Sequence, residues 1–351
     1  MKVRRLGLWS ITLRSVCSLL VPPPTITPVL VPRSKILIDY NTPISFFGSC
    51  FGEAMHSKLG YLKFPRLSSN PMGIAFNPIS IAESLSHSLD GRVWGENDLQ
   101  TANGKRFSFA HHSSFARLDT DSVSAMLAEM NKATREAKMN MELGPGFIFI
   151  TLGTARVYVD KITGRIVANN HRQPEQHFDR KMLTVAECVA GLNGAIEKAK
   201  LANHQVVVTV SPVRHTRDGM AVSSLSKATL RLACAELESL HPHVCTYFPA
   251  FEIVNDELRD YRYFNSDMIH PNDQAVQIIF SRFAQTYFDK TAVERAEKIT
   301  QLKSDFAHRA SPHLEKSVEY LNHCRRTLER MQSMSDIDWT EEISALTGRI
   351  G

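Results

Sequence analysis

The sequence has few cysteines, and no two of them stand close together. Its six cysteines are Cys17, Cys50, Cys188, Cys234, Cys245 and Cys324. Structural zinc sites and disulfide-stapled domains need cysteines at short, repeated spacings, so this scatter argues against both and indicates a reducing compartment. The histidines are also spaced irregularly, and no H-E-x-x-H motif occurs. We therefore expect no metal site and no other cofactor.

Long hydrophobic runs and a strong net charge are absent as well. The apolar stretch over residues 6–21 is broken by Arg14, and no other run approaches the roughly 18 residues that a membrane-spanning helix needs. The formal net charge of +5 is mild, and no Lys/Arg cluster has the density typical of nucleic-acid binding. We expect a soluble protein without stable membrane insertion and without a nucleic-acid partner. Nothing in the sequence indicates its oligomeric state.

Acidic residues are missing from the start of the chain, where the first one is Asp39. Residues 1–34 are basic, contain serine and threonine, and carry prolines at positions 22, 23, 24, 28 and 32. This composition is typical of an organelle transit peptide, and a disordered extension is the alternative. A secretory signal fits less well because Arg14 splits the apolar run. We expect a cytoplasmic or organellar location.

From Lys35 onward, short apolar runs alternate with segments of helical period, which predicts an α/β domain over residues 35–290 with a mostly parallel sheet. A helical tail follows over residues 291–351. The predicted strands cover residues 35–39, 44–47, 147–152, 206–210 and 244–248, with a hairpin over 156–168. The predicted helices cover residues 51–60, 121–139, 184–200, 223–240 and 273–288, and another begins near Ile79.

Three of the strongest strands end in small residues or a proline. These ends are Gly48, Gly153 and the pair Ser211-Pro212. Because the carboxyl ends of parallel strands meet at one edge of a sheet, we expect the three turns to frame a ligand site there.

The turn after the first of these strands carries two nucleophilic side chains, Ser49 and Cys50, directly before a helix. A thiol at a helix N-terminus lies at the positive end of the helix dipole, which favours the thiolate. The alternative interpretation is a buried turn of small residues in which Cys50 is an inert core thiol.

A second informative stretch is Asp267-Met268-Ile269-His270-Pro271. Its carboxylate can accept a hydrogen bond from one imidazole nitrogen while the other nitrogen faces a nucleophile, as a nucleophile–His–carboxylate triad requires. The alternative is a loop histidine beside a helix-capping aspartate.

The turn Gly48-Ser49-Cys50-Phe51 resembles the signature of the GSCFA family, with Gly52 where the family name has alanine. The resemblance covers residues 35–290 and implies a relation to the SGNH/GDSL hydrolases. That relation implies a three-layer α/β/α flavodoxin-like fold and hydrolysis of an O-acyl or O-acetyl ester on a small molecule or a glycan. The other segments that carry the resemblance are residues 70–73, 76–78, 112–113, 151–155, 168–171, 211–214 and 267–271.

The resemblance also implies roles for individual residues. Aligned without a gap, the hydrolase nucleophile falls on Cys50, and a one-residue shift places it on Ser49. His270 becomes the general base and Asp267 its orienting partner. The backbone N–H of Gly73 becomes an oxyanion donor.

The hydrolases' third block departs from the pattern here, because Ala155 stands where they have an asparagine that completes the oxyanion hole. Asn70, Asn77 and the backbone N–H of Ser49 or Cys50 are candidate replacements. Loss of such a donor costs about 10²–10³ in rate, so a non-catalytic binding module on the same fold stays open. An acyltransferase is a third alternative.

Two further residues lie near predicted strand ends. Arg214 could hold an anionic substrate group through both of its terminal nitrogens, and His171 could contact substrate. Each also has a structural interpretation as a hydrogen-bonded residue of the fold.

Overall fold

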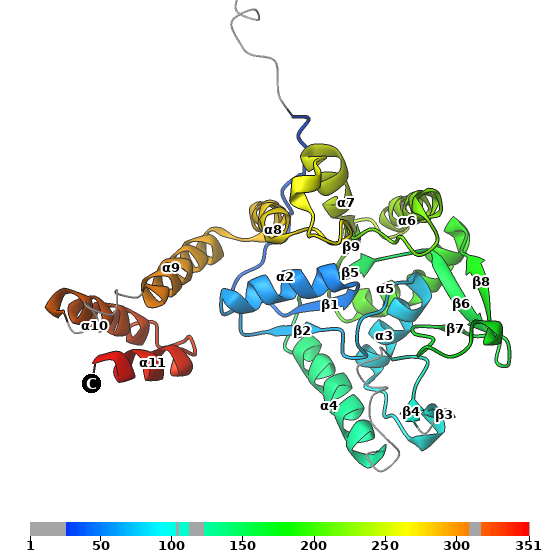
Figure 1. The fold of residues 1–351 in the computed structure, drawn as a ribbon, viewed down its shortest axis with the longest axis horizontal. Coiled ribbons are helices and arrows are strands. Elements are labelled where there is room, and N and C mark those ends of the chain that lie inside the picture. The colour runs from blue at the N-terminus through cyan, green and yellow to red at the C-terminus, as the bar shows by residue number, and fades with distance from the viewer. Residues whose placement is uncertain (1–25, 103–104, 112–122, 309–316, 351) are drawn as a thin grey trace, which may run out of the picture.

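A five-stranded parallel sheet forms the centre of the protein, whose computed structural model describes residues 26–102, 105–111, 123–308 and 317–350 (Figure 1). Its strands lie in the order β10-β9-β5-β1-β2, and every neighbouring pair is parallel. Numbered along the chain, this is the 2-1-3-4-5 order of flavodoxin-like doubly wound folds. The five strands are β1 Ile44–Gly48, β2 Leu67–Ser69, β5 Phe147–Leu152, β9 Gln205–Val210 and β10 Cys245–Tyr247.

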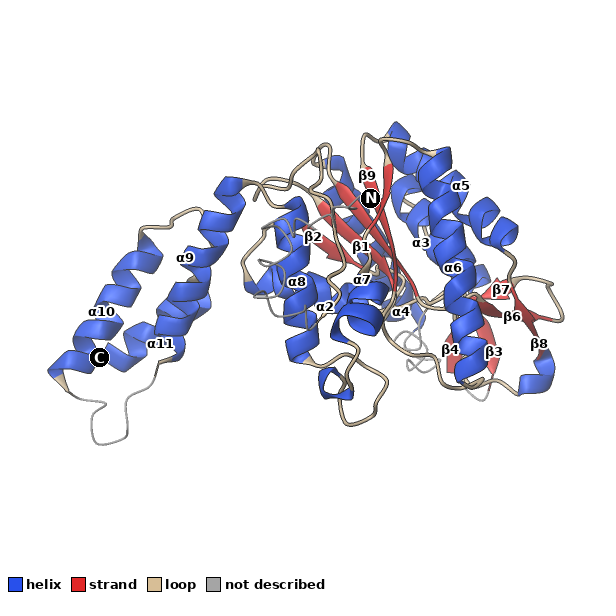
Figure 2. Ribbon diagram, turned by 90° about the horizontal axis from the view of Figure 1, so that it is seen from above, coloured by secondary structure: helices blue, strands red, loops and turns tan. Residues whose placement is uncertain are grey.

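Helices cover both faces of this sheet and make three layers (Figure 2). One face carries α2 (Cys50–Tyr61) and α8 (Asp273–Tyr287). The opposite face carries α3 (Pro78–Asp90), α5 (Val185–Leu201) and α6 (Met220–Leu240). The predicted α/β fold with a parallel sheet is confirmed. The described helices also include α4 (Val123–Glu142), which packs beside α3 against β1 and β2.

Side chains alternate between the two faces along each central strand. In β5, Phe147 and Phe149 pack toward α2 and α8, whereas Ile148, Ile150 and Leu152 pack toward α3, α5 and α6. Every residue of β5 is therefore buried. This two-sided burial is the physical reason for the continuous apolar run in the sequence.

Side-chain caps fix where several helices begin. The predicted capping box of α5 is present: the Glu187 N–H donates to Thr184 Oγ1 at 3.2 Å, and Glu187 Oε2 accepts from the Thr184 N–H at 2.8 Å. Asn77 caps α3 and Asn272 caps α8 in the same way, each by accepting a backbone N–H. The helix containing Cys50 differs, because its N-cap residue Ser49 makes no side-chain cap bond.

One predicted strand is absent from the sheet, and one strand of the sheet was not predicted. The strand predicted over residues 35–39 is wrong, because only Ile38 forms an isolated bridge, with Phe288. Both edges of β1 are already paired with β2 and β5, so the preceding segment has no place beside it. The edge of β1 that faces away from β5 is paired with β2. The sequence did not indicate this strand, because Leu67-Ser68-Ser69 is short and polar.

A small antiparallel sheet adjoins the domain beside α6 (Figure 1). It contains β6 (Arg156–Asp160), β7 (Ile166–Val167) and β8 (Phe178–Met182) in the order β7-β6-β8. The predicted β6–β7 hairpin is confirmed. The third strand was missed because its centre, Asp179-Arg180-Lys181, is exposed and charged. A separate hairpin contains β3 (Gln100–Ala102) and β4 (Lys105–Phe107).

The described N-terminal segment is extended, and the C-terminal segment is helical. Arg33 donates to the carbonyls of Gln285 and Phe288, both at 2.7 Å, which ties this segment to the end of α8. The rest of the predicted extension, residues 1–25, lies outside the described residues. The predicted helical tail is present as α9 (Lys290–Ala307), α10 (Val318–Gln332) and α11 (Thr340–Ile350).

Short helical segments complete the described chain: η1 Glu96–Asp98, η4 Glu175–His177, α7 Ala250–Glu252, the π-helical η5 Ile253–Leu258 and η6 Tyr261–Tyr263. Among the described residues, none of the helices combines the length and the hydrophobicity that a bilayer crossing requires.

Candidate active site

The carboxyl ends of β1, β5 and β9 lie side by side, as predicted from their sequences. Gly48 is level with Thr151, and Leu152 is level with Val210. The residues after β1 and β9 remain bonded to β5. The Ser49 N–H donates to the Thr151 carbonyl at 3.0 Å, and the Ser211 N–H donates to the Leu152 carbonyl at 2.8 Å. The three turns therefore form one edge, at the point where the strand order reverses.

The turn after β1 depends on a glycine. Gly48 has a φ of +126°, and a Cβ added there would lie 2.1 Å from the Thr151 carbonyl oxygen. Its N–H donates to Asn70 Oδ1 at 2.7 Å, and its carbonyl accepts from the Ala75 N–H at 3.2 Å. Both polar groups of this peptide are therefore held while the chain turns into α2.

Of the two candidate nucleophiles, Cys50 borders an open cavity and Ser49 does not. Cys50 is the first residue of α2 and is partly exposed. The cavity, of about 490 Å³, is lined by Cys50 and His270 together with apolar and polar side chains of α2 and α8. Ser49 is only 1% exposed, and its Oγ has no hydrogen-bond partner.

Burial controls the acidity of the Cys50 thiol. It raises the pKa of Cys50 above its ordinary value, and the carboxylate of Glu53 raises it further. The backbone N–H groups of Cys50 and Phe51 and the ammonium of Lys227 act in the opposite direction. The backbone N–H groups at the start of α2 therefore lower the pKa of Cys50, as expected, but desolvation raises it by more. Cys50 rests as a thiol and needs a base to ionise.

Asp267 and His270 form the predicted carboxylate–imidazole pair. Asp267 Oδ2 lies 2.7 Å from His270 Nδ1, while Oδ1 accepts the N–H groups of Ile269 and His270 at 2.8 and 3.0 Å. The His270 backbone N–H, the His270 side chain and the Ile269 N–H lower the pKa of Asp267 to about 2. An ionised Asp267 holds the proton on His270 Nδ1, which leaves Nε2 free to accept one.

Arg214 holds the loop that carries this pair. Its backbone N–H donates to the Ile269 carbonyl at 3.1 Å, and its guanidinium donates to the Met268 carbonyl at 3.2 Å. The guanidinium also lies 4.0 Å from the Phe264 ring centroid and 4.9 Å from that of Tyr261. These contacts make Arg214 a positioning residue of the loop, and they occupy the group that the sequence analysis assigned to a substrate anion.

Three of the predicted oxyanion donors, Gly73, Asn70 and Asn77, are engaged elsewhere. The Gly73 N–H donates to the Asn70 carbonyl at 2.7 Å, inside a turn. Asn70 accepts from Gly48 and donates to Glu53 Oε1 at 3.3 Å. Asn77 caps α3 by accepting the Ser80 N–H at 2.9 Å. Ala155 is buried, and its N–H donates to Ser226 Oγ at 2.7 Å. The backbone N–H groups of Cys50 and Phe51 act as donors to the Cys50 sulfur.

We expect Asn77→Ala to reduce the free energy of unfolding by about 1 kcal/mol, because the first turn of α3 loses its side-chain acceptor. Urea unfolding measures this, and Asn77→Asp, which keeps an acceptor oxygen, is the matched control. Equal stability of the alanine and aspartate variants would contradict the capping role.

His171 lies away from this cavity, beside the β3–β4 hairpin. Its Nε2 is 2.7 Å from the Ser108 carbonyl, and its ring lies 4.8 Å from that of Phe107. The predicted contact of His171 with a substrate at Cys50 has no geometric support from these neighbours. The family-like segment at positions 112–113 lies outside the described residues.

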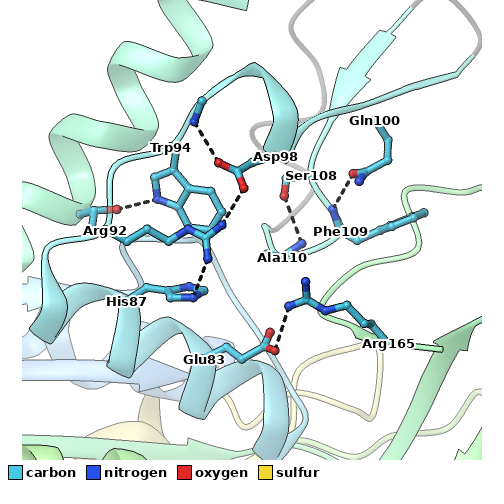
Figure 3. Close-up of polar contacts among 12 residues, drawn as sticks. Glu83, His87, Arg92, Trp94, Asp98, Gln100, Ser108, Phe109, Ala110 and Arg165 are labelled. Atoms are coloured by element: carbon cyan, nitrogen blue, oxygen red, sulfur yellow. Dashed lines mark hydrogen bonds and ion pairs between the residues drawn. The ribbon is translucent and has the colours of Figure 1, made fainter. Parts of the chain in front are cut away.

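A second polar pocket, of about 140 Å³, lies between α3 and the β3–β4 hairpin (Figure 3). Arg92 lies 4.4 Å from the Trp94 ring centroid, donates to Asp98 at 2.6 Å and lies 3.0 Å from His87 Nε2. Burial and the Arg92 charge lower the pKa of His87 to about 4. Glu83 pairs with Arg165 at 3.3 Å. These charges satisfy one another, and the cluster ties α3 to the segment 92–98 before β3 and, through Arg165, to the β6–β7 hairpin. The described residues contain no group of three potential metal ligands.

Lys227 is a site residue that the sequence analysis missed. It lies on α6, is 4% exposed, and donates from Nζ to the carbonyls of Gly153 and Ser211, both at 2.7 Å. Burial lowers the pKa of Lys227 to about 7, and Cys50 acts to raise it. A signal was present, because Lys227 falls on the same helical face as Ser223, Leu230 and Cys234, where an ordinary lysine would not be buried.

Comparison with known protein families gives a match between residues 43–283 and the model of the GSCFA family. The matched segment includes the Gly48–Cys50 turn, Lys227 and the Asp267–His270 pair. Neither the curated proteins nor the solved structures gave a match.

Proposed function

This chain belongs to the GSCFA family, and from its site we propose that it is a hydrolase that cleaves an ester through an acyl-enzyme on Cys50. One observation carries the proposal: Cys50 and His270 line the same cavity, while Asp267 holds His270 in the tautomer that leaves Nε2 free. A nucleophile, a base within the same cavity and an orienting carboxylate are the parts that acyl transfer needs.

The proposed reaction has two halves. His270 Nε2 takes the proton of the Cys50 thiol as the sulfur attacks the ester carbonyl, and the carbonyl oxygen becomes an oxyanion near the amides of Cys50 and Phe51. Collapse of this intermediate breaks the ester C–O bond, and His270 returns its proton to the leaving alkoxide. Water, deprotonated by His270, then attacks the thioester, and the carboxylic acid leaves as Cys50 recovers its proton.

The raised pKa of Cys50 gives His270 its role in this scheme. A thiol that already existed as thiolate would need no base, whereas burial keeps Cys50 protonated in the resting enzyme. Removal of the proton in the attacking step avoids a stable buried thiolate.

The cavity lining combines apolar and polar side chains. Phe51, Ala54, Val213 and Val276 give it apolar walls, while Ser57 and Asn265 offer polar groups for the alcohol side. We therefore propose an O-acetyl or similarly short O-acyl ester, on a small molecule or a glycan, as the substrate class.

Intact mass measurement after p-nitrophenyl acetate treatment tests this proposal. We expect p-nitrophenol release and a transient increase of about 42 Da on the Cys50 peptide, which is the mass of an acetyl group replacing the thiol proton. Acyl transfer to an added alcohol with little free acid would instead favour the acyltransferase. A chain without turnover or adduct would contradict hydrolysis and favour the binding module.

We expect Arg214→Ala to lower ester turnover about 10- to 100-fold, because His270 loses the support of its loop and its geometry loosens. Steady-state kinetics measure this effect. Arg217→Ala is the matched control, since Arg217 lies on the same segment but pairs with Glu175. Equal activity of the two variants would contradict the positioning role of Arg214.

A further inference from the structure

Lys227 places a charged group beneath the edge at which Cys50 is presented. Its two acceptors, the carbonyls of Gly153 and Ser211, belong to the residues that directly follow β5 and β9. β5 is the neighbour of β1, whose end leads to Cys50, and β9 lies on the other side of β5. The ammonium therefore lies between the ends of the sheet and the helix layer that contains α6.

Nothing in the described fold neutralises this charge. The described residues provide Nζ with two carbonyl acceptors but with no carboxylate within ion-pair distance. An ammonium has three N–H donors, so one remains for the site. A charged lysine buried without a counter-ion is costly, and a negative charge that forms beside it keeps it protonated.

The titratable groups that interact with Lys227 indicate where this negative charge forms. Cys50 is the group whose anionic form interacts favourably with Lys227, and the interaction acts in both directions. His215, which follows β9, also feels the Lys227 charge and has its pKa lowered by burial and by Lys227. Glu53 opposes Lys227, since it disfavours the Cys50 thiolate.

We propose that Lys227 is a positioning residue whose buried ammonium stabilises the negative charge that develops on the Cys50 sulfur. The inference rests on the proposed function in taking Cys50 as the nucleophile. It explains how a thiol that is buried beside a carboxylate can still be ionised by His270. Because Lys227 is shielded from water, its charge acts through a medium that screens it weakly.

The pH dependence of Cys50 alkylation by iodoacetamide, followed on the Cys50 peptide by mass spectrometry, tests the inference. We expect Lys227→Met to lower the alkylation rate about tenfold at neutral pH and Lys227→Arg to keep it near the wild-type rate. Ser226→Ala is the matched control, because it removes a buried α6 contact to the same strand end without changing charge.

A purely structural role predicts a different result. Lys227→Met would then have a lower melting temperature but the wild-type alkylation profile, and this outcome would overturn the inference. Alkylation needs no ester turnover, so a changed profile in a chain without hydrolytic activity would support the role of Lys227 while contradicting the proposed function.

A reciprocal measurement covers the case in which Lys227 variants do not fold. Coupling between two charges is mutual, so Cys50→Asp, which places a fixed negative charge at this position, should raise the pH at which the Lys227 ammonium titrates relative to Cys50→Ser, as followed by NMR of labelled lysine side chains. Cys50 is partly exposed, so its replacement by serine leaves the packing intact. An unchanged Lys227 titration would overturn the inference.

Discussion

Replacement of Cys50 by alanine is expected to lower ester hydrolysis by about 10³-fold or more and to abolish the acyl adduct. The sulfur is the group to which the acyl carbon bonds, so no neighbouring side chain can take over its role without moving into the cavity. Cys50 is partly exposed and is bonded to no other cysteine. The melting temperature should therefore stay near that of the wild type, and kinetics with intact mass measurement check both statements.

Ser49→Ala is the control for this experiment. The Ser49 hydroxyl is buried without a partner, so its removal should leave activity unchanged and stability equal or slightly higher. The opposite pattern, with an inactive Ser49→Ala and an active Cys50→Ala, would move the nucleophile back by one residue. It would also require the Ser49 side chain to leave its buried position during the reaction.

The parts of the fold that were predictable from sequence are those in which local pattern and tertiary structure agree. The run Phe147–Leu152 is apolar throughout because both of its faces are covered, and this is visible without coordinates. The Thr184–Glu187 capping box is likewise a local signal. The strands 35–39, Leu67–Ser69 and Phe178–Met182 were misjudged because pairing with a neighbour, not side-chain pattern, decides short or polar strands.

The candidate site divides in the same way. The Asp267–His270 pair was predictable because its hydrogen bonds span only three residues. The roles of Arg214 and Lys227 were not, because each depends on partners brought together by the fold: Arg214 on a loop 54 residues away, and Lys227 on the ends of two strands. Likewise, Asn77 lies in a turn beside the sheet, but only its backbone partner shows that it caps a helix.

The structure shows why position 155 supplies no oxyanion donor to the cavity. Ala155 is fully buried and its backbone N–H is bonded to Ser226, so no side chain from this position reaches the cavity. In the proposed reaction, backbone amides at the start of α2 and the buried Lys227 ammonium would meet the negative charge. Fixed donors and charges of this kind need no reorganisation when the charge develops, so loss of one side chain need not abolish catalysis.

Gly48→Ala is expected to reduce the free energy of unfolding by about 4 kcal/mol or more, which many domains cannot tolerate. Two penalties combine at this position. The φ of +126° is strained for any residue with a side chain, and the added Cβ would lie 2.1 Å from the Thr151 carbonyl oxygen. That oxygen also accepts the Ser49 N–H, so a shift to relieve the clash would break the bond between β5 and the turn.

Gly164→Ala separates these two penalties. Gly164 has a φ of +68° in the β6–β7 hairpin, and no atom lies within 4 Å of an added Cβ. Its replacement should cost about 1–2 kcal/mol, the strain of a left-handed backbone alone. Urea unfolding of both variants measures the difference, and equal losses would contradict the close approach of β1 and β5 at Gly48. The larger loss is expected because Cys50 can face the cavity only if the chain turns while still touching the neighbouring strand, and only a residue without a side chain fits that space.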